Sequence, residues 1–222
     1  LTLRVYSLVC YLPNRHPLKD DTRARALNEY ALAFKNGRDA RVSTPVSFEE
    51  LVVRVARALV KPEALQGKDP STCVFTPMPR SGNSKASHDQ GAHPYPCRRL
   101  AQVMAEVSGG QFGELVERSS PIEPNSHSLR AQRGSLSAIV QPTGRASTIV
   151  LVDDVMTSGA SLYAAAEALR QEADYLFVDI IAVTMAYTAE LRDDQLHQNT
   201  SHELSKPTRN RDRPTRKSLR PG

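Results

Sequence analysis

The segment Ile-Val-Leu-Val-Asp-Asp-Val-Met-Thr-Ser-Gly-Ala-Ser-Leu at residues 149–162 constrains the fold of this chain more than any other. Its first four residues form an unbroken aliphatic run, which is typical of a strand buried on both faces of a parallel sheet. Small and hydroxylated residues follow, and apolar side chains then recur at helical spacing, at Leu162, Ala165, Ala166 and Leu169. The sequence therefore predicts a strand, a turn and a helix, as in α/β folds.

The polar residues of this segment indicate a phosphorylated ligand. Asp153 and Asp154 come at the carboxyl end of the predicted strand, where ligands of open α/β sheets bind. The small residues at 157–161 leave N–H groups free for a phosphate at the start of the helix, and the helix dipole favours an anion there. The two carboxylates repel phosphate, but they suit vicinal hydroxyls or a cation. We therefore expect a sugar phosphate, with its hydroxyls on the carboxylates.

Residues 149–161 closely resemble the 5-phosphoribosyl-1-pyrophosphate (PRPP) motif of type I phosphoribosyltransferases. That motif consists of a hydrophobic strand, two acidic residues, a hydrophobic residue, any residue, Thr, Thr or Ser, Gly, a small residue, and Ser or Thr. Every position fits. The alternative is an arbitrary strand–turn–helix unit with an Asp cap, which any α/β protein could contain.

The resemblance implies an enzyme, a Mg²⁺-dependent transferase that moves the 5-phosphoribosyl group of PRPP to a nitrogen acceptor such as a nucleobase. It implies an α/β fold with a parallel-sheet, Rossmann-like core and flanking helices. In this reading Asp153 and Asp154 are catalytic and contact the metal indirectly, through PRPP-bound Mg²⁺. The expected phosphate-binding residues are Val155, Met156, Thr157, Ser158, Gly159, Ala160 and Ser161.

Two further segments resemble the family's loops. The turn Pro79-Arg80-Ser81-Gly82 is placed like its pyrophosphate loop, so Pro79, Arg80 and Ser81 are expected to bind pyrophosphate together with Arg118; a plain Pro-rich turn is the alternative. Residues 119–146 lack a hydrophobic pattern and occupy the place of its flexible catalytic loop, which makes Arg130 and Arg133 catalytic candidates. A loop of that length is either a functional lid or a sign that helices and strands in this segment have been overlooked.

The order of the motifs most resembles the ComF-like branch of the family. A Pro-x-Pro loop at 76–79, Arg-Leu-Ala at 99–101, spaced arginines at 130–133 and the Asp pair follow that order, whereas the branch's Cys-x-x-Cys element is missing. The alternative function is a non-catalytic protein of this fold, either a PRPP- or nucleotide-sensing regulator or a competence- or nucleic-acid-associated protein.

Periodicity and turn residues divide the chain into three parts. Strands are predicted at 72–76, 112–116, 149–152 and 176–183, and helices between Ser47 and Pro62, at 94–107 and from the motif to Glu172. We expect an N-terminal extension or hood at 1–70, a phosphoribosyltransferase core at 71–190, and a flexible basic tail at 191–222.

The positive charge is concentrated at the C-terminus. The chain has a formal net charge of +5, and residues 201–222 hold seven basic and two acidic residues, a net of +5. Three prolines and few apolar residues in this segment predict disorder. The segment could attract nucleic acid weakly, or it could be a solvated end without a role.

The remaining expectations concern location and redox state. No apolar run approaches the ~20 residues of a membrane span, and residues 1–12 lack the features of a secretory signal, so a cytoplasmic protein without membrane contact is expected. Cys10, Cys73 and Cys97 are widely spaced and are expected to be reduced thiols. The sequence leaves open whether the protein forms a homo-oligomer.

Overall fold

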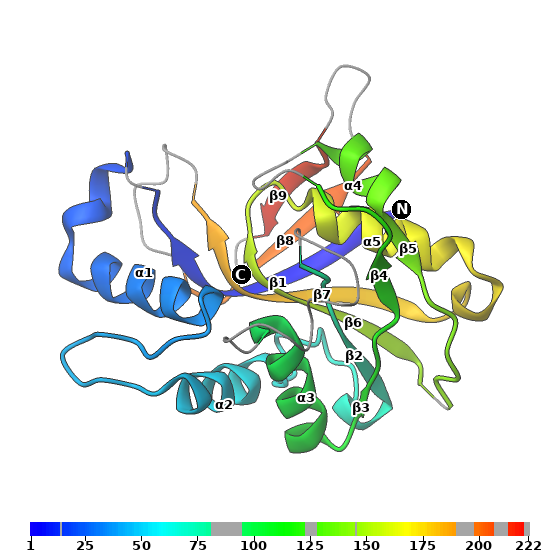
Figure 1. Cartoon of the computed structure of the whole chain (residues 1–222), viewed down its shortest axis with the longest axis horizontal. Coiled ribbons are helices and arrows are strands. Elements are labelled where there is room, and N and C mark those ends of the chain that lie inside the picture. The colour runs from blue at the N-terminus through cyan, green and yellow to red at the C-terminus, as the bar shows by residue number, and fades with distance from the viewer. Residues whose placement is uncertain are drawn as a thin grey trace.

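The computed structural model describes residues 1–13, 15–80, 95–122, 128–144, 146–189, 198–206 and 213–219. A seven-stranded mixed sheet with the order β3-β2-β6-β7-β1-β8-β9 lies at its centre (Figure 1). Its strands are β1 (Thr2–Tyr11), β2 (Cys73–Pro77), β3 (Gln111–Phe112), β6 (Thr148–Met156), β7 (Asp179–Thr188), β8 (Thr200–Ser205) and β9 (Thr215–Leu219). The five strands from β3 to β1 are mutually parallel, and β8 and β9 continue the sheet in antiparallel fashion. The predicted α/β fold with a mostly parallel sheet is confirmed.

Helices cover both faces of the sheet (Figure 1). One layer contains α1 (Thr22–Lys35), α2 (Phe48–Leu59) and α3 (Pro96–Ser108), and the other contains α5 (Ala160–Gln171) and α4 (Leu129–Ser135). A two-stranded sheet of β4 (Val116–Arg118) and β5 (Leu136–Ala138) lies beside α4, and short 3-10 turns occur at Pro17–Asp20, Pro70–Thr72 and Ala173–Tyr175. Among the described residues, no helix combines the length and apolar character needed to cross a membrane.

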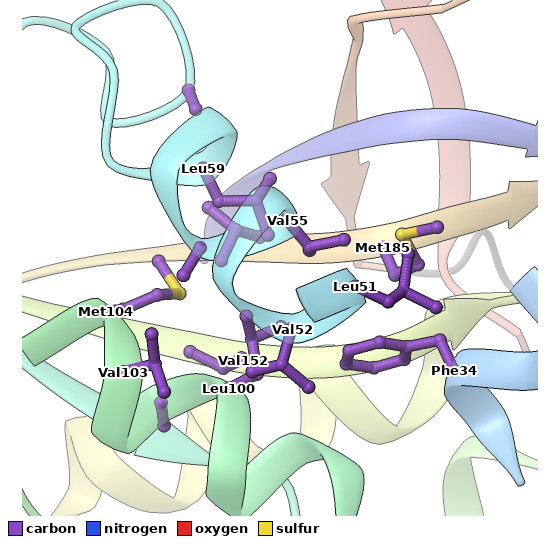
Figure 2. Close-up of a cluster of buried hydrophobic side chains, with 14 of the residues drawn as sticks. Phe34, Leu51, Val52, Val55, Leu59, Leu100, Val103, Met104, Val152 and Met185 are labelled. Atoms are coloured by element: carbon purple, nitrogen blue, oxygen red, sulfur yellow. The ribbon is translucent and has the colours of Figure 1, made fainter. Parts of the chain in front are cut away.

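Strand β6 is buried on both faces because its aliphatic side chains alternate between two apolar clusters. Val150 and Val152 face the cluster of α2 and α3, whereas Ile149 and Leu151 face the cluster that includes α5. Figure 2 shows the first cluster, in which side chains of α2 and α3 meet Val152 and Met185. With both faces covered by packed helices, the strand can offer a ligand its ends and not its faces.

The predicted end signals of the α2 helix are confirmed. The Ser47 hydroxyl accepts a hydrogen bond from the Glu50 N–H at 3.3 Å, and α2 ends at Leu59, before Pro62. Gly109, with a φ of 72°, caps α3 in the left-handed conformation that glycine adopts without a steric penalty. These elements were predictable because each signal lies within a few residues of the element it ends.

Two predicted strands are placed differently. The strand expected at 112–116 is split, since β3 joins the main sheet and β4 joins the small one. The strand expected to begin at 176 begins at Asp179, and Phe177 is 98% exposed. The Val178 N–H donates to the Tyr175 carbonyl, so a turn occupies the first residues of that apolar run.

The expected boundaries at both chain ends need correction. Residues 1–70 do not form a separate extension, because β1 lies between β7 and β8 in the main sheet. The predicted flexible tail at 191–222 is wrong for the described residues 198–206 and 213–219, which contain β8 and β9. In β8, Thr200, His202 and Leu204 alternate inward and are buried, and this alternation stabilises a strand even where the average composition is polar.

The segment at 119–146 is not a continuous loop. Among its described residues, 128–144 include the helix α4 and the strand β5. The Ser128 hydroxyl accepts a hydrogen bond from the Ala131 N–H at 3.3 Å and caps α4, and Leu129 is fully buried. The segment lacks the long periodic pattern that would have predicted a helix, because α4 has only seven residues.

Candidate functional site

The carboxyl end of β6 positions Asp153 and Asp154. Asp153 lies opposite Thr184 of β7 in the parallel register, so both acidic residues extend a strand whose preceding residues are in the core. The Asp153 carboxylate accepts a hydrogen bond from the Asp154 N–H at 2.9 Å, and the Asp154 carboxylate accepts one from the Val155 N–H. The backbone thus holds each carboxylate in a fixed place and leaves further oxygen lone pairs for a ligand.

Burial, followed by the neighbouring charge of Asp154, raises the pKa of Asp153 to about 7. Burial raises the pKa of Asp154 as well. Two carboxylates held this close in a poorly hydrated place are stabilised by a ligand that donates hydrogen bonds or carries positive charge. The pair is therefore suited to bind sugar hydroxyls, a metal ion, or both.

Cys97, near the start of α3, lies beside the carboxylates. Its sulfur is 3.9 Å from Asp153 Oδ1, and one ligand atom from each of Cys97, Asp153 and Asp154 falls within a span of 4.8 Å. Burial, followed by the two acidic charges, raises the pKa of the Cys97 thiol well above its usual range, so the sulfur stays protonated. Carboxylate oxygens are the ligands that Mg²⁺ prefers, and a protonated thiol is not one. The donor set fits a hard cation held by the two aspartates.

The loop 157–161 follows directly and begins α5. Gly159, with a φ of 74°, occupies the cap position and has no side chain to cap the helix, and the Ser158 hydroxyl accepts a hydrogen bond from the Ala160 N–H at 3.4 Å. The Tyr163 N–H bonds the Gly159 carbonyl at 2.9 Å, whereas the earlier amides point out of the helix start. Asp153 and residues 155–162 line one solvent-open hollow of about 250 Å³. Asp153 and the loop that begins α5 therefore border the same space.

Gly159 is required at its position for two structural reasons. Its positive φ is strained for other residues, and a Cβ atom there would lie 2.5 Å from Leu204 Cδ1 of β8. The C-terminal hairpin is therefore a close neighbour of this glycine.

Arg80 supplies a cation near the acidic pair. Its guanidinium lies over the ring of Tyr95, 4.9 Å from the centroid. Burial raises the pKa of Tyr95 well above its usual range, and so do the charges of Asp153 and Asp154, while the Arg80 charge acts in the opposite direction. Arg80 and the aspartates thus act on the same buried phenol. Pro79 precedes Arg80 directly after β2, and Ser81 lies outside the described residues.

Arg118 is an internal anchor of the Arg80 turn. Its Nε atom donates to the Arg80 carbonyl at 2.9 Å, and its two Nη atoms donate to Ser135 Oγ and Gln132 Oε1. The residue is only 8% exposed. These contacts join the turn after β2 to α4. Arg118 therefore supports the backbone of Arg80.

The two remaining arginines of the sequence-based site belong to α4. Arg133 forms a bidentate ion pair with Glu167 of α5, with Nε–Oε2 at 2.6 Å and Nη2–Oε1 at 2.7 Å. Arg130 lies on the same helix and is exposed. The observed contacts of Arg133 thus join α4 to α5, the helix that begins at the 157–161 loop.

One residue near the site was missed from the sequence. Arg216 of β9 donates through Nη1 to the Thr157 carbonyl at 3.3 Å and to the Thr188 carbonyl at 3.1 Å. It was assigned to the flexible tail, and no local motif marks it. The inward alternation of residues 200, 202 and 204 was the available signal that a strand lies nearby.

Comparisons with known proteins add a fold likeness only. Neither the family models nor the curated proteins include a match to this chain. Among solved structures, the chain is similar to the crystal structure of adenine phosphoribosyltransferase from Leishmania tarentolae, with a TM-score of 0.32 and 16% sequence identity. The alignment covers 76% of this chain and 90% of that chain. A similarity this low carries no argument about activity.

Proposed function

We propose that the protein is a Mg²⁺-dependent phosphoribosyltransferase that takes PRPP as the donor and a nitrogen compound such as a nucleobase as the acceptor. One observation carries the proposal. A half-buried carboxylate pair and the start of α5 follow one another at the end of a central parallel strand, and Asp153 and the 157–161 loop line the same hollow. In a phosphorylated sugar, the ring hydroxyls can meet the carboxylates while the phosphate meets the start of the helix.

The proposed roles follow from charge and hydrogen-bonding capacity. The amides of the 157–161 loop bind the 5-phosphate, where the dipole of α5 favours an anion. The ribose hydroxyls donate to Asp153 and Asp154, whose negative charge stabilises the positive charge that develops at the anomeric carbon when its bond to pyrophosphate loosens. Bound Mg²⁺, held by these carboxylates with PRPP, would neutralise charge on the pyrophosphate.

Pyrophosphate binding is assigned to the turn that follows β2. The Arg80 guanidinium provides the positive charge, Arg118 positions that turn through the Arg80 carbonyl, and Pro79 and Ser81 belong to the same proposed segment. We keep Arg130 and Arg133 as proposed catalytic residues. For Arg133, this role requires that its ion pair with Glu167 opens when PRPP binds.

A second function, binding without turnover, is favoured by the contacts of the arginines. Arg118 and Arg133 hold structural elements together, whereas Asp153 and the 157–161 loop line the hollow and Asp154 lies beside Asp153. A regulator that senses PRPP or a nucleotide needs the aspartates and the 157–161 loop to bind its ligand, and it does not need catalytic arginines.

Replacing both carboxylates tests the proposed catalysis. In Asp153→Asn/Asp154→Asn, each asparagine Oδ1 can still accept the backbone hydrogen bond made by the aspartate, so the fold should persist. PRPP consumption with Mg²⁺ and a panel of nucleobases should fall by at least about 100-fold, the scale for loss of a charge-stabilising group. Asp174→Asn, an exposed position in the turn after α5, is the control and should match the parent.

The outcomes separate the two functions. PRPP binding without consumption by the parent protein would favour the regulator. A double variant that consumes PRPP at the parental rate would contradict the assignment of the two aspartates.

A further inference from the structure

The β8–β9 hairpin lies against the 157–161 loop. Leu204 of β8 and Arg216 of β9 are cross-strand partners in the antiparallel register. Leu204 is fully buried and packs where a Cβ on Gly159 would lie, and Arg216 bonds the Thr157 carbonyl. One pair of facing side chains therefore contacts two residues of the loop.

The same face of the hairpin also covers the end of β7. The His202 and Tyr187 rings meet edge to face with centroids 4.6 Å apart, and the Arg216 guanidinium lies 5.7 Å from the Tyr187 centroid. Lys217, the next residue of β9, is exposed and lies opposite Glu203. Side chains alternate along a strand, so Arg216 faces the loop and Lys217 does not.

Arg216 bridges the ends of two neighbouring strands. Thr157 directly follows β6 and Thr188 is the last residue of β7, and Nη1 of Arg216 reaches the carbonyl oxygens of both. Carbonyl oxygens carry partial negative charge and would repel a phosphate nearby. The guanidinium offsets that charge at the edge of the sheet where the ligand hollow opens.

The contact also sets the direction of an amide. In a trans peptide the C=O and the N–H point to opposite sides. When Arg216 holds the Thr157 carbonyl, the Ser158 N–H of the same peptide unit points away from the hairpin. Thr157 and Ser158 both line the hollow, so a fixed peptide here presents a fixed donor beside the helix start.

We propose that the C-terminal hairpin is part of the sugar-phosphate site and that Arg216 is its positioning residue, which orients the Thr157–Ser158 peptide and adds positive charge beside the bound phosphate. The inference rests on the proposed function only in naming the ligand. The hold of Arg216 on the loop can be measured in the free protein.

The test compares Arg216→Gln with Lys217→Gln, an equal loss of charge on the adjacent, outward-facing residue. Amide hydrogen exchange in the free, full-length protein should become faster at 158–162 in Arg216→Gln, while the amides of β6 keep the parental rates. Affinity for ribose 5-phosphate, measured by calorimetry, should fall about tenfold, the scale for loss of a charge-assisted hydrogen bond. Lys217→Gln should match the parent in both measurements.

Arg216→Lys separates positioning from charge and serves if Arg216→Gln does not fold. Lysine keeps the charge but lacks the planar fork of arginine, so affinity should recover in part while exchange at 158–162 stays faster than in the parent. If the arginine variants match Lys217→Gln in both loop exchange and affinity, the inference is overturned and the proposed function stands. If the parent binds no ribose 5-phosphate, the proposed function fails, and the exchange comparison still decides whether Arg216 holds the loop.

Discussion

Asp153 is half-buried and His202 is buried, and the loss of hydration moves their pKa values in opposite directions. Burial raises the pKa of Asp153 to about 7, because the charged carboxylate loses its hydration. Burial, and then the charge of Arg216, lowers the pKa of His202 to about 3. Within the described part of the chain, neither ring nitrogen of His202 has a hydrogen-bond partner. The aspartate can regain charge with a cationic ligand, whereas the histidine stays neutral beside Arg216.

The pKa of His202 predicts a pH dependence of stability. Because the folded pKa lies below the unfolded value of about 6.5, the unfolded state binds more protons between these values, and stability is lost as the pH falls from about 6.5 toward 3. Between pH 7 and pH 5 this one group should lower the free energy of unfolding by about 2 kcal/mol.

Urea unfolding at pH 7 and pH 5 measures this dependence. His202→Gln should lose less stability than the parent over that interval, because glutamine does not titrate. Equal losses in the parent and the variant would show that His202 titrates in the folded protein as it does in the unfolded chain.

Elements with local signals were predictable, and elements that depend on distant partners were not. Residues 149–162 predicted a buried strand, a turn at Gly159 and a helix, and the structure has all three in that order. The strands β8 and β9 were missed because their hydrogen bonds are made with β1, at the other end of the chain, and with each other. The role of Arg216 follows from that pairing, so no segment of sequence considered alone could reveal it.

Removal of residues 198–222 should destabilise the protein. The deletion would expose the edge of β1 and uncover apolar surface that Leu204 packs against. Truncation of that side chain alone, in Leu204→Ala, should cost about 2–5 kcal/mol, which corresponds to a fall in the melting temperature of roughly 4–20 °C for a chain of this size.

Thermal unfolding of the deletion protein and of Leu204→Ala provides the measurement. Ser205→Ala, one residue along β8 and directed to the other face, should melt close to the parent temperature. A deletion protein that melts like the parent would mean that the hairpin is not packed on the sheet.

At the scale of the whole molecule, the basic excess of the C-terminus lies partly in the main sheet. Arg216 faces the 157–161 loop, while Arg213 and Lys217 are exposed. The charge that suggested a weak nucleic-acid contact therefore includes a cation beside the proposed sugar-phosphate site. The carboxyl ends of β6 and β7, the start of α5 and the β8–β9 hairpin meet at this one edge of the sheet.

Calorimetric titration of PRPP with Mg²⁺ into the parent, Ser161→Asp and Ser161→Asn tests the central claim most directly. Ser161 is the second residue of α5 and lines the hollow. A carboxylate there should stabilise the helix start by about 0.3–1 kcal/mol and yet repel a phosphate. We predict that the parent and Ser161→Asn bind PRPP and that Ser161→Asp folds at least as stably but shows no binding. Equal PRPP affinity of all three proteins would contradict the assignment of the 5-phosphate to the 157–161 loop.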